Sequence, residues 1–298
     1  MWYNLNKWNR LFGVKLRFHP LFSIVILLSI LAGYFIETAT LFGIVLIHEL
    51  GHVMAAKNFG WRVKEIQLLP FGGVAVVEEL ASVPAWQEII VTLSGPLQNG
   101  IMMVAAMALQ ATGVISGEWS AYFIQANLFV ALFNLLPILP LDGGKIMQSL
   151  LSLWLPYQRV IVLSCVASLV LSVVLIAAAV LHIIYGGFQL NLFIIGLFLF
   201  YSNWYAYKGM SYHFMRFLIH RGNTLNRLMR QGTLAQPIVV DGRRKVTEIV
   251  RLFMREKYHL VYVMDERGAI RVVLPEQPLL QTYFNESKRG SAISELFM

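Results

Sequence analysis

The stretch that decides the fold is TLFGIVLIHELGHVMAA, residues 40–56, in which a His-Glu-x-x-His pattern lies inside an apolar run. The run contains no Lys or Arg, and Glu49 is its one acidic residue. On a helix, His48 and His52 are one turn apart on the same face. Their imidazoles can then bind one metal ion, with Glu49 beside them as a base for an attacking water. Two ligands leave such a site incomplete, so a third must come from elsewhere in the chain.

The composition indicates that this stretch lies in a membrane. Of the 298 residues, 57% are hydrophobic and only 13% are charged, against about 25% charged in a soluble domain. A Glu and two His in hydrocarbon cost several kcal/mol unless they have a use. This cost argues against the alternative that the two histidines are ordinary core residues satisfied by hydrogen bonds. The single cysteine, Cys165, excludes a disulfide within the chain and is expected to be buried.

Six apolar segments approach the length of about 20 residues that a membrane helix needs. They are residues 20–36, 39–57, 87–112, 119–141, 158–182 and 187–207. The fold class is therefore predicted to be a polytopic α-helical membrane protein. Residues 1–19, which are basic and contain Trp2 and Trp8, favour an interfacial lead-in over a cleaved signal peptide.

Lys and Arg predict the orientation of these spans. They occur before the first span, at Lys57 and nearby, at Lys145 and Arg159, and from Lys208 onward, whereas the connections near 37–39, 113–118 and 183–187 contain none. This alternation predicts that both termini are cytoplasmic. His52 lies five residues before Lys57, so the metal is expected within the membrane but nearer its cytoplasmic side.

Two features near the metal helix add to the site. Residues 61–79 alternate in polarity around Pro70-Phe71-Gly72-Gly73, which predicts a β-hairpin that lines the entrance, with Phe71 and Gly72 contacting substrate. The third span contains Ser94-Gly95-Pro96, which serves either as a packing kink or directly in the site.

The fourth span ends in Asn134-Leu-Leu-Pro-Ile-Leu-Pro140-Leu-Asp142-Gly-Gly, where two prolines and two glycines surround one carboxylate. Broken backbone at membrane depth is tolerated where it is buried in protein or lines a wet cavity. Asp142 is therefore the natural third zinc ligand, which leaves an open position for water. The alternative is an aspartate that caps a helix end at the membrane surface. Asn134 and Pro140 are predicted to contact the substrate.

The C-terminal part has a different character. Residues 208–298 carry a net charge of +7 out of +8, which favours contact with anionic lipid over nucleic acid because no nucleic-acid motif accompanies it. Residues 208–225 predict an amphipathic linker helix. Beyond them we expect strands over 238–240, 260–264 and 269–274 and helices over 246–257 and 279–284. A unit of this size has a marginal core, so pairing with a second copy is expected. His19, His182, His213, His220 and His259 lack ligand spacing and are left out of the site.

The pattern His48-Glu49-Leu-Gly-His52, followed by Asn134-Leu-Leu-Pro and Pro140-Leu-Asp142-Gly-Gly, resembles the site-2 protease family of intramembrane zinc metalloproteases. The resemblance implies that His48, His52 and Asp142 bind Zn²⁺ and that Glu49 is the general base and acid. More narrowly, six spans followed by a small C-terminal unit resemble a sporulation branch of that family, in which the soluble part is a cystathionine-β-synthase (CBS) domain.

That narrower resemblance implies a domain plan and partners. Residues 1–207 would be the six-helix metalloprotease domain, 208–225 the linker and 226–298 a CBS-like regulatory domain, with 246–273 similar to its core. The substrate would be a membrane-associated, pro-sigma-K-like protein, and inhibitory membrane proteins would restrain the enzyme in the membrane that surrounds the forespore. ATP could bind the CBS-like unit, but only one CBS half is visible, so a homo-oligomer would be needed.

Three alternatives keep part of this interpretation. The same protease chemistry could act on an anti-sigma factor or a signal-peptide remnant. A metal transporter could use the same ligands, but the non-cytoplasmic halves of the spans offer almost no carboxylates. A non-catalytic membrane adaptor would leave Glu49 unexplained, because binding alone needs no base beside a histidine pair.

Overall fold

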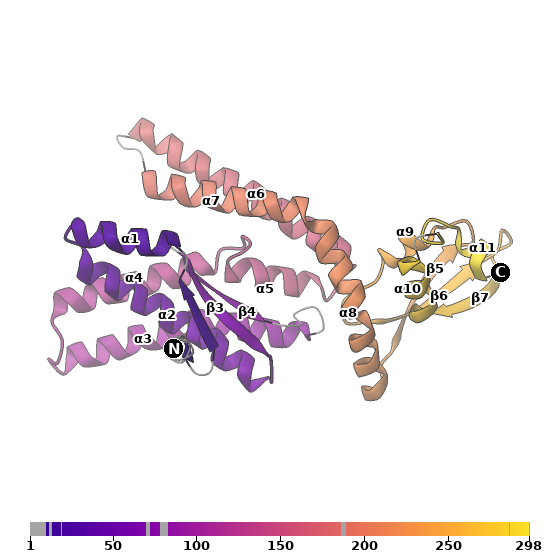
Figure 1. Cartoon of the computed structure of the whole chain (residues 1–298), viewed down its shortest axis with the longest axis horizontal. Coiled ribbons are helices and arrows are strands. Elements are labelled where there is room, and N and C mark those ends of the chain that lie inside the picture. Colours follow the sequence, from indigo (N-terminus) through magenta and orange to yellow (C-terminus); the bar gives the residue numbers. More distant parts are fainter. Residues whose placement is uncertain are drawn as a thin grey trace, which may run out of the picture.

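The computed structural model describes residues 10–11, 14–18, 20–69, 72–77, 83–185, 189–285 and 287–297. Most of the chain is helical, and Figure 1 shows α1–α7 at one end of the molecule, a small C-terminal unit at the other, and α8 between them. The helices are α1 (Pro20–Leu31), α2 (Phe35–Asn58), α3 (Ala85–Ala111), α4 (Gly117–Asn134), α5 (Asp142–Leu151), α6 (Tyr157–Leu181), α7 (Leu190–Lys208), α8 (Met210–Gln231), α9 (Val246–Val250), α10 (Glu276–Phe284) and α11 (Ile293–Phe297). The strands are β1 (Arg10–Leu11), β2 (Val14–Phe18), β3 (Val63–Leu69), β4 (Gly72–Val77), β5 (Ala235–Asp241), β6 (Tyr258–Met264) and β7 (Ile270–Pro275).

Three helices of the described part are long and apolar enough to cross a membrane. They are α2, α3, and α6 with the short helical turn that follows it, Tyr157–Ile184. Helix α1 falls in the first predicted span but has only 12 residues, fewer than the about 20 that a span needs. Helices α4 and α7 fall in the fourth and sixth predicted ranges. The predicted membrane character is therefore carried by α2, α3 and α6, two of which hold residues of the predicted site.

The N-terminal sheet has the strand order β1-β2-β3-β4. Strands β3 and β4 form the predicted antiparallel hairpin, with Leu69 opposite Gly72. The described part of residues 1–19, which were expected to form an interfacial lead-in, consists of β1 and β2. Val14 to Phe18 alternate apolar and basic residues, which is the period of a strand, and β2 pairs in parallel with β3 from Lys15↔Glu65 onward. Figure 1 shows this sheet beside α2, so it belongs to the surroundings of the metal helix.

The break between α4 and α5 returns the chain to the site. Helix α4 ends at Asn134, and α5 begins at Asp142. The two glycines that follow are required by close packing, not by unusual backbone angles. A Cβ on Gly143 would lie 2.1 Å from the carbonyl oxygen of Leu135, and one on Gly144 would lie 2.5 Å from the carbonyl carbon of Ile138. The turn therefore folds directly onto the start of α5 and holds Asp142 in the helix's first turn.

The C-terminal unit is a three-stranded sheet, β5-β6-β7, covered by α9 and α10. Strands β5 and β6 are parallel, and β6 and β7 are antiparallel. The predicted helix over 246–257 is wrong in length, because α9 ends at Val250. The remainder forms a loop, since the backbone and side chains of Arg255 and Glu256 are used in contacts with other elements. Helix α10 begins at Glu276, three residues before the predicted start.

The core of this unit is continuous with two helices outside it. One buried cluster joins the strands of the C-terminal sheet to α8 through Phe217 and Leu225 and to α6 through Ile161 and Cys165. Each fully buried side chain of this size contributes about 1.5–3 kcal/mol. The C-terminal unit was expected to have a marginal core. Its core is instead enlarged by side chains from α8 and α6 of the same chain.

Candidate metal centre

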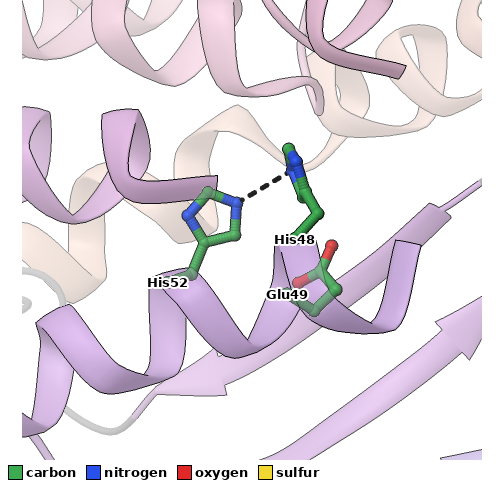
Figure 2. A group of neighbouring side chains, drawn as sticks. All are labelled: His48, Glu49 and His52. Atoms are coloured by element: carbon green, nitrogen blue, oxygen red, sulfur yellow. Dashed lines mark hydrogen bonds between the residues drawn. The ribbon is translucent and has the colours of Figure 1, made fainter. Parts of the chain in front are cut away.

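His48, Glu49 and His52 lie on α2 and are buried, with 2%, 5% and 7% of their surface exposed. Figure 2 shows the two imidazole rings turned toward each other across one helical turn, with Glu49 beside His48. The Nε2 atoms of the two histidines are 3.2 Å apart. A ligand atom of Glu49 lies within 4.8 Å of those of the histidines. The i, i+4 spacing thus places both rings and the acid at one point, as the sequence predicts.

Asp142 completes this group from 94 residues further along the chain. Its Oδ2 lies 3.1 Å from the Nε2 atom of His48 and 3.1 Å from that of His52. The three atoms form a nearly equilateral triangle. Tetrahedral zinc with bonds of about 2.0–2.2 Å needs ligand atoms about 3.3–3.6 Å apart. The triangle is therefore slightly tighter than a zinc site and has the right shape for one.

The hydrogen bonds of the far ring nitrogens determine which atoms face the triangle. Nδ1 of His52 donates to the carbonyl oxygen of Val91 at 2.8 Å, and Nδ1 of His48 donates to Oδ1 of Asn99 at 2.6 Å. In the neutral rings both Nε2 atoms then carry lone pairs. Two lone pairs and a carboxylate oxygen converge with no proton between them. This arrangement is repulsive unless a cation lies among the three atoms, so the donor set fits a metal ion.

The orientation of Asn99 is fixed by a chain of hydrogen bonds that ends on the backbone. Nδ2 of Asn99 donates to Oδ1 of Asn127, and Nδ2 of Asn127 donates to the carbonyl oxygen of Phe123. Both asparagines are fully buried. Because a carbonyl can only accept, each amide in the chain has one allowed orientation. Oδ1 of Asn99 must therefore face His48, and the proton of His48 must be on Nδ1.

Asp142 is held by side chains of its own helix and of two neighbouring helices. Its second oxygen, Oδ1, accepts from Lys145 Nζ at 3.1 Å. The turn that leads to Asp142 is anchored at Leu139, whose N–H donates to Ser168 Oγ on α6 at 2.9 Å and whose carbonyl accepts from Asn203 Nδ2 on α7. Ser168 and Asn203 are buried among apolar side chains. The helix pair α6–α7 thereby fixes the loop that leads to Asp142.

Gly95 of the Ser94-Gly95-Pro96 stretch lies against the histidines. A Cβ at this position would be 2.4 Å from Nε2 of His52 and 2.7 Å from Nε2 of His48. The side chain of an alanine would therefore enter the space that faces both lone pairs. Of the two interpretations left open for this stretch, the geometry at Gly95 favours a direct part in the site.

The other predicted contact residues lie at varying places. Asn134 is half-buried at the end of α4, and its Nδ2 donates to the carbonyl of Val130 on its own helix. Pro140 is exposed, two residues before Asp142. Gly72 begins β4, whereas Phe71 lies outside the described residues. Among the described residues, Asn134, Pro140 and Gly72 are not brought into hydrogen-bond contact with the triangle.

Sequence reasoning missed five residues that hold His48 or the segment around Asp142 in place: Asn99, Asn127, Lys145, Ser168 and Asn203. The three asparagines gave a usable signal, because an amide inside an apolar helix is expensive unless it has a partner. Ser168 gave none, since serine hydroxyls in membrane helices commonly bond their own backbone.

A second buried polar cluster lies away from the metal triangle and contains His259, which the sequence analysis leaves out of the site. Arg221 of α8 donates from Nε to Oε2 of Glu276 at 2.8 Å and from Nη2 to Oε1 at 2.9 Å. His259 donates from Nδ1 to Oε1 of Glu276 at 2.6 Å, and its Nε2 accepts from the N–H of Met254 at 3.2 Å. Arg221, Glu276 and His259 are each 0% exposed. Nη1 of Arg221 also donates to the carbonyl oxygen of Arg255, and Nη2 to that of Lys257, so each donor nitrogen of these side chains has at least one acceptor.

Comparison with known proteins gives a consistent result. The family model described as "Peptidase family M50" matches residues 36–118 and 110–176. The chain is 34% identical to stage IV sporulation protein FB of Bacillus subtilis (strain 168) over 294 residues, which is 99% of each chain. It is 32% identical to zinc metalloprotease MJ0392 of Methanocaldococcus jannaschii over 155 residues, covering 48% of this chain and 44% of the relative.

A solved structure is also similar. The site-2 protease from Methanocaldococcus jannaschii superposes with a TM-score of 0.54 and 26% sequence identity, covering 65% of this chain and 91% of that one. The match to the sporulation protein extends over nearly the whole of both chains, and the family model spans the helices that carry His48, His52 and Asp142. The chain belongs to peptidase family M50, the site-2 proteases, and is a membrane zinc metalloprotease of that type.

Proposed function

We propose that this chain hydrolyses a peptide bond of a membrane-associated protein within the membrane, with zinc held by His48, His52 and Asp142 and with Glu49 moving the proton. The observation that carries the proposal is the convergence of three acceptor atoms on one point, at 3.1, 3.1 and 3.2 Å from one another. A zinc ion bound there would act as a Lewis acid on the scissile carbonyl and on the attacking water.

Glu49 supplies the proton chemistry in this scheme. Its carboxylate is buried beside the histidines and is not one of the three atoms of the triangle. It takes a proton from the water as the oxygen attacks the carbonyl carbon of the substrate. It then gives that proton to the leaving nitrogen, so the C–N bond breaks to yield one new carboxyl group and one new amine. Asn99 and the Val91 carbonyl keep the two imidazoles in place throughout.

The hairpin beside α2 is the proposed place for the substrate chain. Among the described strands of the N-terminal sheet, β4 is at the edge next to α2 and pairs with β3 alone. A helical peptide bond is shielded, so the substrate must unwind before it is cut. An extended segment can add to the open side of β4 as a further strand. Phe71, Gly72, Asn134 and Pro140 remain the proposed substrate contacts.

The proposed substrate is a pro-sigma-K-like protein with a membrane-associated N-terminal prosequence, cut during sporulation. The support is the resemblance to a sporulation protein across 99% of both chains. The runner-up is the same chemistry on an anti-sigma factor or a signal-peptide remnant, because the metal site itself does not distinguish these substrates.

The proposed organisation is a six-span membrane domain, residues 1–207, with both termini in the cytoplasm. The linker 208–225 and the CBS-like unit 226–298 follow, and the protein would reside in the membrane around the forespore. Support comes from the alternation of connections that contain Lys or Arg with connections that contain neither. Inhibitory membrane proteins are proposed partners. Nucleotide binding would need CBS-like units from two copies, and pairing of those units is part of the proposal.

The test is cleavage of a co-expressed, membrane-tethered pro-sigma-K-like substrate by the wild-type chain and by Glu49→Gln, followed as a size shift. We expect product with the wild type and none with Glu49→Gln. Equal cleavage by both would overturn the role of Glu49. Cleavage of an anti-sigma substrate but not of the pro-sigma-K-like one would overturn the proposed substrate and keep the chemistry.

A further inference from the structure

The first turn of α3 is held by side chains from the C-terminal unit. Helix α3 follows Pro84, which provides no side-chain cap. The first N–H groups of a helix have no partner inside it, and the N–H of Ala85 donates to Oε1 of Glu256. A carboxylate at this end also complements the helix dipole. Glu256, from the loop after α9, therefore caps α3 from a position 171 residues away in sequence.

Arg255, the neighbour of Glu256, contacts the start of α3 through a buried ion pair. It is 6% exposed and lies against Glu88, which is 9% exposed. Its Nη1 is 2.5 Å from Oε2 of Glu88, and its Nη2 donates to the carbonyl oxygen of Val83 at 2.9 Å. Removing one partner of a buried charge pair leaves the other charge uncompensated. The start of α3 is thus tied to this loop by a buried ion pair and by backbone hydrogen bonds.

The same helix orients the metal triangle. Val91, three residues after Glu88, accepts the hydrogen bond from Nδ1 of His52 at 2.8 Å. Gly95, one turn further, approaches the Nε2 atoms of both histidines too closely for any side chain. Movement of α3 along or about its axis would therefore either lengthen the Val91–His52 bond or push backbone into the site. Helix α3 therefore both holds His52 through Val91 and borders the space between the histidines at Gly95.

The other side of the contact is held by several hydrogen bonds. The carbonyl oxygen of Arg255 accepts from Nη1 of Arg221 at 2.6 Å, and Arg221 is bound to Glu276 in the balanced buried cluster. The N–H of Met254 donates to His259 in the same cluster. The backbone around Arg255 is therefore held by the fully buried side chains of Arg221 and His259.

We propose that Arg255 is a positioning residue for the metal centre, which acts through Glu88 and α3 on His52. The proposal rests on the proposed function, in which His52 is a metal ligand. The C-terminal unit then contributes to the geometry of the catalytic site although no residue of it reaches the metal. Its loop 251–257 and the first turn of α3 are expected to move together, because Arg255 and Glu256 bind that turn.

The experiment uses the purified full-length chain and compares wild type with Arg255→Met and Glu88→Gln. Zinc affinity is measured by competition with a chelator, and Co²⁺ is substituted to record the ligand-field absorption spectrum. We expect both variants to bind zinc roughly 3- to 30-fold more weakly and to shift the Co²⁺ bands. The double variant should be little worse than either single one, because the two residues act through one contact.

Two controls separate a positioning role from loss of folding. Arg251→Met removes a charge from the same loop at an exposed position and should leave affinity and spectrum unchanged. Glu88→Gln changes α3 and leaves the sequence of the C-terminal unit unchanged, so the same effect in Glu88→Gln and Arg255→Met points to the contact that the two residues share. Wild-type affinity and spectrum in both Arg255→Met and Glu88→Gln would overturn the inference.

A His52→Ala variant distinguishes this failure from failure of the proposed function. If the wild type binds no zinc, or if His52→Ala binds it as well as the wild type, the proposed metal centre is wrong. If His52→Ala loses zinc while Arg255→Met and Glu88→Gln match the wild type, only the positioning role is wrong.

Discussion

The two buried polar clusters of this molecule contain similar groups and are built on opposite principles. The metal triangle combines two histidines with Asp142, and the C-terminal cluster combines His259 with Glu276 and Arg221. In the C-terminal cluster each donor nitrogen of Arg221 and His259 has an acceptor, and the carboxylate of Glu276 accepts from both side chains. In the triangle three acceptors face one another, because the protons of both rings are directed outward to Val91 and Asn99.

The difference shows that a functional site can be recognised by comparing the hydrogen-bond donors of a buried cluster with its acceptors. Buried polar groups are normally paired, so a cluster in which donors and acceptors balance is already complete and serves the fold. A cluster in which acceptors alone converge needs a cation. Burial and residue type do not separate the two clusters here, whereas the balance of donors and acceptors does.

The largest effect, on the free energy of unfolding, should come from removing one charge of the Arg221–Glu276–His259 cluster. Arg221→Met leaves Glu276 buried without its cation, and we expect a loss of about 3–5 kcal/mol in unfolding free energy. Denaturant unfolding of the full-length chain measures it, with Arg230→Met, an exposed position on the same helix, as the control. Replacing both partners, in Arg221→Met/Glu276→Leu, should recover part of the loss. A loss below about 1 kcal/mol in Arg221→Met would show that the cluster is not the structural element described.

A smaller effect is expected when the outward hydrogen bond of the triangle is removed. Asn99→Ala leaves Nδ1 of His48 without its acceptor, and zinc affinity should fall about 10- to 100-fold. Asn99→Asp keeps an acceptor and should lose less. Gln110→Ala, at an exposed position of the same helix, is the matched control. Unchanged zinc affinity in Asn99→Ala would mean that the chain from Phe123 to His48 does not orient the ligand.

The smallest effect concerns pH. Burial alone would raise the pKa of Glu276, but the hydrogen bonds from Arg221 and His259 outweigh it and hold the pKa below its ordinary value. A carboxyl whose pKa is lower in the folded state stabilises the fold above its unfolded pKa and loses that contribution as the pH falls through its folded pKa. The melting temperature of the wild type should therefore fall as the pH drops below about 4.5. Glu276→Gln should show a flatter profile, and parallel profiles would contradict this assignment.

Local sequence patterns predicted the parts of the site that lie close together in the chain. The His-Glu-x-x-His spacing determines the geometry of His48 and His52 once the stretch is helical. Two prolines and two glycines around Asp142 indicate a broken helix, and the structure shows that the glycines are needed where α5 packs on the turn. The β3–β4 hairpin was predictable because its turn and its alternation are contiguous.

Features that depend on distant partners were not predictable from one sequence. Strand β2 pairs with β3 some fifty residues later, and its alternation of basic and apolar residues also suits an interfacial segment. Residues 251–257 continue a helical pattern, but Arg255 and Glu256 are drawn out of it by α3, about 170 residues away. The anchoring of Leu139 by Ser168 and Asn203 involves a backbone group, which no side-chain pattern reports.

At Gly95 the preference of a helix for alanine conflicts with the space that the two histidines need. Glycine within a helix is less favourable than alanine by about 1 kcal/mol, so the helix alone would favour alanine at this position. The methyl of that alanine would lie 2.4 Å from Nε2 of His52, where it would compete with the ion for the same space. An alanine at position 95 would thus displace an imidazole from the ion, and the sequence would lose its zinc site without losing a single ligand or charge.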